Sequence, residues 1–185
     1  MQAALDGAMR VFRERGYHAA SLSDLSAAMK LTTGSIYKAF NDKRAVFLAA
    51  LDHYVDLRNA QLRQLLEAET SGFDKLRAAL AFYAETSHDA EGRLGCLVVG
   101  SVTEVVTFDP EMAGRVTDAV RRIETMVRDL IRLGQSDGSI PAGVDADVSA
   151  RTLLCVLEGL RVVGKAGRTR AEMMAVATQA LLLLA

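Results

Sequence analysis

The sequence predicts an all-α protein with about nine helices. Alanine, leucine, valine and arginine are abundant among its 185 residues, half of which are apolar, and such a composition favours helices. Along most of the chain the apolar residues recur every three or four positions, which is the spacing of helices with one buried face. No strand, internal repeat or low-complexity segment is recognisable.

Residues 2–15 predict the first helix. Gly16 is expected to end it with a positive φ, because glycine adopts the left-handed conformation that commonly follows a helix. Tyr17 is then expected to turn back toward the core. The predicted buried stripe consists of Leu5, Ala8, Met9 and Phe12.

Residues 21–40 predict two short helices joined by a tight turn. Ser21 and Asp24 have the spacing of a capping box, so the first of these helices begins after Ser21. Lys30 falls at the left-handed position of the turn, where a residue other than glycine costs on the order of 1 kcal/mol. Thr32 can cap the following helix.

The exposed face of this last helix carries hydroxyls, a phenol and a cation, but no carboxylate. These side chains are Thr33, Ser35, Tyr37 and Lys38. A helix of this kind is suited to a DNA groove lined by phosphates and base edges. The alternative interpretation is a two-helix hairpin with a purely structural role in a helical bundle.

The stretch from Leu31 to Tyr37 reads L-T-T-G-S-I-Y and is followed by Phe40 and Lys43. With the segments around it, this pattern resembles the DNA-binding domain of the TetR/AcrR family of transcriptional regulators over about the first fifty residues. The resemblance implies a homodimeric DNA-binding regulator, usually a repressor, that binds a double-stranded DNA operator and a small-molecule effector. The expected DNA-binding residues are Ser21, Thr32, Thr33, Gly34, Ser35, Tyr37, Lys38 and Lys43.

Charge is distributed unevenly although the net charge of the chain is −1. Residues 1–66 contain nine lysines and arginines against six acids, whereas the remainder contains thirteen against seventeen. A basic beginning and an acidic remainder fit a DNA-binding module joined to a regulatory one. From the order of the predicted helices, we expect a helix-turn-helix domain at 1–42 and a helical regulatory and dimerisation domain at 43–185.

The second predicted domain contains the remaining helices. A polar loop is expected at 87–92 and a turn-rich loop at 134–143. The helix after the polar loop is apolar nearly all round and should be surrounded by others. The predicted helices are 42–67, 73–86, 94–108, 110–133, 145–163 and 170–184.

An effector pocket would lie among the middle helices of this second domain. Cys96 could be a redox or electrophile sensor near a helix start, or a small buried hydrophobe, whereas Cys155 is expected on a buried face. For each candidate the alternative is ordinary core packing. The candidate ligand-binding residues are Tyr83, Cys96, Val99, Thr103, Phe108, Met126 and Glu158.

The last two predicted helices are apolar and could form a four-helix interface with a second copy. Gly159 and Gly164 would allow close approach, and the resemblance favours this dimer over a purely internal core. The candidate dimer-interface residues are Leu153, Leu157, Leu160, Thr178, Leu181 and Leu182.

Other classes of function find little support. The three histidines lie in separate elements without metal-ligand spacing, and no phosphate loop or nucleophile motif is present, so we expect no metal, no cofactor and no enzyme activity. No apolar run reaches the roughly 18 residues of a membrane span, and two cysteines are consistent with the reducing cytoplasm. The rival hypothesis is a helical small-molecule binding protein or enzyme with a structural hairpin.

Overall fold

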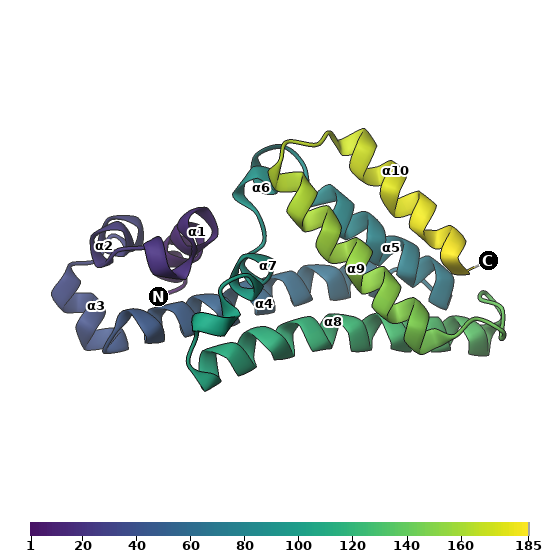
Figure 1. The fold of residues 1–185 in the computed structure, drawn as a ribbon, viewed down its shortest axis with the longest axis horizontal. Helices are drawn as coiled ribbons and strands as arrows, with labels where there is room; N and C mark the ends of the chain where they lie inside the picture. Colours follow the sequence, from purple (N-terminus) through teal and green to yellow (C-terminus); the bar gives the residue numbers. More distant parts are fainter. Residues whose placement is uncertain (185) are drawn as a thin grey trace. The chain divides into compact units, whose positions relative to one another are not determined.

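The prediction of an all-α fold is confirmed. The computed structural model describes residues 1–184, and this part of the chain contains helices and no strand (Figure 1). The helices are α1 (Gln2–Ala19), α2 (Leu22–Met29), α3 (Thr33–Phe40), α4 (Lys43–Glu67), α5 (Gly72–Glu85), α6 (Asp89–Leu94), α7 (Leu97–Val102), α8 (Pro110–Asp137), α9 (Ala146–Lys165) and α10 (Arg170–Ala180), with short 3-10 turns η1 (Val105–Thr107) and η2 (Leu181–Leu184).

The chain divides into two compact units. The head unit comprises Met1–Arg58 and Cys96–Asp118, and the body unit comprises Asn59–Gly95 and the chain from Ala119 onward. The helices α4 and α8 each contribute residues to both units. Because the head unit includes a second stretch of chain, a compact unit does not coincide with residues 1–42, and the functional boundary at 42/43 stays a prediction.

The helix caps and left-handed residues predicted for the head unit are present in the structure. Ser21 and Asp24 form a complete capping box at α2, and the side chain of Thr32 accepts a hydrogen bond from the Ser35 amide at the start of α3. Lys30 adopts the left-handed conformation, with φ of 54°. Gly16 has φ of 76° and breaks the helical path of α1, after which a short turn continues to Ala19.

Aromatic rings contribute to the core of the head unit. Phe47 of α4 lies edge-on to Phe12 of α1, with ring centroids 5.2 Å apart, and its centroid is 5.1 Å from that of Tyr17. Phe108, which follows η1, lies 5.5 Å from both Tyr17 and Phe47. These contacts join the segment around η1 to the helices of the head unit.

The starts of α4 and α8 are capped by aspartates. Asp42 accepts the Ala45 amide at 2.7 Å, and Asp109 accepts the amides of Glu111 and Met112 at 3.0 and 3.1 Å. Asp109 is also paired with the guanidinium of Arg44 at 2.7 Å. Hydrogen bonds from Arg44 lower the pKa of Asp109 to about 2, so this cap remains charged at neutral pH.

The core of the body unit lies among α5, α8, α9 and α10. The helices α5, α9 and α10 pack on one another and run alongside each other in Figure 1. Leucines of α9 are at its centre, together with Leu76 and Leu80 of α5 and Val127 and Ile131 of α8.

Gly134 does not begin a loop, which corrects the predicted end of the helix at 133. The helix α8 continues to Asp137 because Gly134 serves close packing instead of a turn. A Cβ built on Gly72 would lie 2.1 Å from the backbone nitrogen of Gly134, so the start of α5 approaches α8 at backbone distance. The carboxylate of Asp137 then accepts the Gly72 amide at 2.7 Å.

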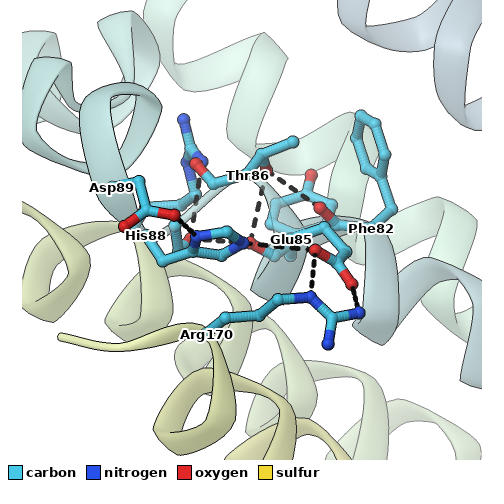
Figure 2. Close-up of polar contacts among 9 residues, drawn as sticks. Phe82, Glu85, Thr86, His88, Asp89 and Arg170 are labelled. Atoms are coloured by element: carbon cyan, nitrogen blue, oxygen red, sulfur yellow. Dashed lines mark hydrogen bonds and ion pairs between the residues drawn. The ribbon is translucent and has the colours of Figure 1, made fainter.

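The predicted polar loop at 87–92 is also wrong, because α6 begins at Asp89. Figure 2 shows Glu85 between the imidazole of His88 and the guanidinium of Arg170. His88 also contacts Asp89 at 2.7 Å, and its hydrogen bonds to Glu85 and Asp89 raise the pKa of His88. These contacts, of which the one with Arg170 is long-range, hold a turn that looks unstructured in the sequence.

The predicted helix at 94–108 is shorter than expected. Gly95, with φ of 83°, interrupts it at one end, and α7 stops at Val102. The hydroxyls of Thr103 and Thr107 donate to carbonyl oxygens three residues earlier, at 2.7 and 2.6 Å, and such bonds compete with helical ones. The segment is also not surrounded as predicted, since Val106 is 90% exposed.

Candidate nucleic-acid interface

The helix α3 presents a polar surface to solvent. Thr33, Gly34, Ser35 and Lys38 are exposed, and Tyr37 is 47% exposed. Ile36, on the opposite face, is fully buried. Because residues 32–40 contain no acid, this surface can approach phosphates without charge repulsion.

Hydroxyl groups at both helix starts are already hydrogen-bonded within the head unit. The Thr32 hydroxyl lies 2.9 Å from that of Ser35. Ser21 donates its hydroxyl to Asp24 at 2.6 Å, and hydrogen bonds from Ser21 lower the pKa of the Asp24 carboxyl. If these hydroxyls contact DNA, they do so from side chains whose positions are already fixed by hydrogen bonds within the protein.

Packing within the protein does not require a glycine at position 34. A Cβ at this position would meet nothing closer than the Thr32 hydroxyl at 4.0 Å. Glycine inside a helix costs about 1 kcal/mol relative to alanine. Its position on the exposed face of α3 fits a close approach of the backbone to a partner.

Lys43 is not directed freely into solvent. Its ammonium donates to the carbonyl oxygens of Ala20 and His18, at 2.8 and 3.2 Å, and lies 4.6 Å from the centre of the Tyr17 ring. The sequence suggested a cation at a helix start and gave no sign of these partners.

The seven predicted ligand-binding residues fall in different units. Cys96, Val99, Thr103 and Phe108 belong to the head unit, where Thr103 is exposed and Phe108 packs in the aromatic cluster. Tyr83, Met126 and Glu158 belong to the body unit, and the first two pack against its core.

Glu158 is the one carboxyl among these candidates, and its pKa is shifted. Burial raises its pKa to about 7, although the guanidinium of Arg161 acts in the opposite direction. When burial raises the pKa of a carboxyl, the folded state holds the proton more tightly than the unfolded state. The folded state is therefore favoured at low pH, and this advantage is lost as the pH rises from the unfolded-state pKa through the folded-state pKa.

We therefore expect the free energy of unfolding to fall between about pH 4.5 and 7 through Glu158. Glu158→Gln should remove this dependence and be more stable than the wild type by roughly 2 kcal/mol at pH 8, after allowance for partial exposure. Urea unfolding at pH 5 and pH 8 measures both effects, with Glu67→Gln, which alters an exposed carboxylate, as the control. Parallel pH curves for wild type and Glu158→Gln would contradict the assignment.

One of the two cysteines differs from expectation, whereas the role of Cys96 stays a prediction. Cys96 is half-buried and precedes α7, a helix of six residues that offers a thiolate little support. Cys155, expected on a buried face, is exposed. Neither forms a disulfide in the described chain.

The predicted dimer interface needs a correction on α9. Leu153, Leu157 and Leu160 are at most 2% exposed and belong to the body core, so they cannot contact a second copy. Thr178 and Leu182 are exposed, and Leu181 is half-buried. Gly164 also serves internal packing, because a Cβ there would lie 2.1 Å from the carbonyl oxygen of Ser87.

A different face of α9 is exposed. Its uncharged residues recur at helical spacing, five of them exposed and Gly159 half-buried: Val148, Thr152, Cys155, Gly159, Val162 and Val163. We call these residues the α9 stripe. A Cβ on Gly159 would meet nothing within 4 Å, so this glycine is free to face another helix.

Sequence reasoning missed Glu104. Its carboxylate accepts the backbone amides of Tyr17 and His18, at 3.2 and 3.3 Å. A signal was present, since Glu104 is the single charged residue in the stretch 94–108. An isolated acid among valines requires a partner, although the sequence cannot name it.

Two further observations concern the described chain as a whole. Among residues 1–184 no group of three or more His, Cys, Asp or Glu side chains has the arrangement of a metal site. No helix in the same part of the chain is long and apolar enough to cross a membrane.

Two family models match the chain. Residues 4–50 match the model described as bacterial regulatory proteins, tetR family. Residues 72–181 match the model described as tetracyclin repressor-like, C-terminal domain. The first match contains α2 and α3, and the second covers more than half of the chain.

Similar proteins are named as transcriptional regulators. The chain is 28% identical over 176 residues to the HTH-type transcriptional repressor ComR of Escherichia coli K12, which covers 95% of this chain and 84% of ComR. It is 33% identical over 128 residues to the HTH-type transcriptional activator FasR of Mycolicibacterium smegmatis, covering 69% of this chain and 56% of FasR.

A solved structure has the same fold. It is a cysteine mutant of the TetR family transcriptional regulator CifR, complexed with a 26-bp double-strand operator DNA. The TM-score is 0.87 and the identity 31%, with 98% of this chain and 95% of CifR covered. The enzyme or carrier hypothesis is therefore set aside, and the chain belongs to the TetR family of DNA-binding transcriptional regulators.

Proposed function

We propose that this protein is a homodimeric repressor that binds an operator through α3 and leaves it when a small molecule binds. The observation that carries the proposal is the exposed face of α3, which is polar, free of acids and capped by Thr32. The expected DNA-binding residues all lie in the head unit. Because an operator is chromosomal DNA, we also propose that the protein acts in the cytoplasm.

The proposed dimer places the α9 stripe against its counterpart in a second copy. On α10 and η2 a second uncharged stripe is exposed, formed by Ala171, Ala175, Thr178 and Leu182. Two adjacent helices with small residues at their centres can pack closely against the same pair in a symmetric dimer. Such a dimer would present two copies of α3 to successive major grooves.

The proposed effector is a small apolar or aromatic molecule bound in the body. Tyr83 and Met126 are half-buried against its core and are the residues we favour for this contact. Binding would favour a dimer conformation with a different spacing of the two heads.

Fluorescence anisotropy with the protein's own upstream DNA tests this proposal. We expect saturable binding that is at least a hundredfold tighter than to a scrambled duplex of equal length. A reporter gene behind the same DNA then gives the sign of regulation. Higher expression when the protein is removed supports a repressor, lower expression indicates an activator, and equal affinity for both duplexes would contradict the proposal.

A further inference from the structure

The connection between α1 and α2 leads directly into the helix pair α2 and α3. It runs from Gly16 to Ala20 and is followed directly by Ser21, which caps α2. Gly16, with φ of 76°, interrupts the helical path, and the amides and carbonyls that follow it are hydrogen-bonded by side chains. Such groups need partners when they are shielded from water.

The amides of this connection are bound by one carboxylate oxygen. Oε2 of Glu104 accepts both the Tyr17 and the His18 amide, at 3.2 and 3.3 Å. A Cβ on Gly16 would lie 2.1 Å from the other Glu104 oxygen, so this carboxylate fits against the glycine itself. Beside it, Nε2 of His18 lies 2.7 Å from the Thr107 hydroxyl.

The carbonyls of the same connection are bound by one ammonium. Nζ of Lys43 donates to the Ala20 carbonyl at 2.8 Å and to the His18 carbonyl at 3.2 Å. The same nitrogen lies over the Tyr17 ring, 4.6 Å from the ring centroid. Hydrogen bonds that involve a charged partner are about twice as strong as neutral ones.

We propose that Glu104 and Lys43 are positioning residues for DNA recognition, which hold the α1–α2 connection from its amide and carbonyl sides without touching DNA. All these groups lie within the head unit. The inference rests on the proposed role of α3 in binding DNA. It assigns Lys43 a different task from the phosphate contact expected from its sequence position, because its ammonium already has partners.

The salt dependence of operator binding separates positioning from phosphate contact. A lysine on a phosphate contributes about 0.9 to the slope of log affinity against log salt, and removing it lowers the slope by that amount per head. We expect Lys43→Met and Glu104→Ala each to weaken operator binding about tenfold with the slope unchanged. Lys38→Ala is the comparison variant, for which the slope should fall.

Glu104→Gln provides the matched control. Both amides bind a single oxygen, so the glutamine carbonyl can replace it, and we expect affinity within about twofold of the wild type. Hydrogen exchange by NMR should show that the Tyr17 and His18 amides lose protection in Glu104→Ala and keep it in Glu104→Gln. This measurement requires no DNA.

Several results would overturn the inference. A reduced salt slope for Lys43→Met would mean that Lys43 contacts phosphate, and wild-type affinity in Glu104→Ala would mean that the connection needs no such support. If Glu104→Ala does not fold, a tenfold loss in a folded Glu104→Gln would be the contradicting result. Failure of the wild-type protein to distinguish its operator from scrambled DNA would instead contradict the proposed function, and the exchange measurement would still report on the connection.

Discussion

Replacing Lys38 with alanine is expected to weaken binding to all DNA sequences and to lower the salt slope by about 0.9 for each head. Lys38 is the only cation on α3, and its ammonium is exposed. Because we expect it to contact phosphates, specific and scrambled duplexes should lose affinity to a similar extent, roughly tenfold for a dimer with two such contacts. Anisotropy titrations at several salt concentrations measure both quantities.

The matched control is Arg63→Ala, which removes the same charge from an exposed position in the body unit. It should leave the slope unchanged.

Thr33→Ala and Ser35→Ala should instead reduce affinity for the operator more than for scrambled DNA, because short hydroxyl side chains can reach base edges. An unchanged slope in Lys38→Ala would exclude α3 as the groove-binding helix.

The helices around the predicted DNA-binding surface could be read from the sequence because their signals are local. A capping box spans four residues, and the left-handed Lys30 and the cap Thr32 are equally short-range features. Each determines where a helix begins or ends without reference to the remainder of the fold. The family resemblance covers the same stretch, so both lines of reasoning agreed there.

The body was less predictable because its determinants are distant in sequence. Gly134 looks like a turn residue until α5 is known to approach it through Gly72. Arg170 binds Glu85, shortly before the start of α6, from 85 positions away. A helix-boundary prediction that uses only neighbouring residues cannot include these contacts.

The same limit explains the error on α9. Its apolar residues occupy more than one face, and periodicity cannot decide which face the chain buries for itself. The leucines fill the core because α5 and α10 cover them, and this leaves valines and small residues outside. The Glu104 contact was beyond reach for a similar reason, since its partners are backbone amides that no sequence pattern marks.

Val162→Arg is expected to convert the proposed dimer into a folded monomer and to weaken operator binding a hundredfold or more. Val162 lies on the α9 stripe and is 56% exposed, so arginine is tolerated in a single chain. In the proposed dimer it would bring a charge and its symmetry mate into an apolar interface. A monomer binds one half-site and loses the benefit of linked heads, which is typically 10²–10⁴ in affinity.

Val176→Arg is the matched control, because Val176 is a similarly exposed valine, at 44%, on a different face of α10 from its uncharged stripe. It should sediment as a dimer and bind the operator normally.

Leu157→Arg should unfold the protein, because Leu157 is 1% exposed within the core. Sedimentation velocity at micromolar concentration and circular dichroism distinguish the three outcomes. If Val162→Arg remains a dimer while Val176→Arg dissociates, the interface lies on the other face of these helices. A wild-type monomer that still binds the full operator tightly would contradict the proposed dimer itself.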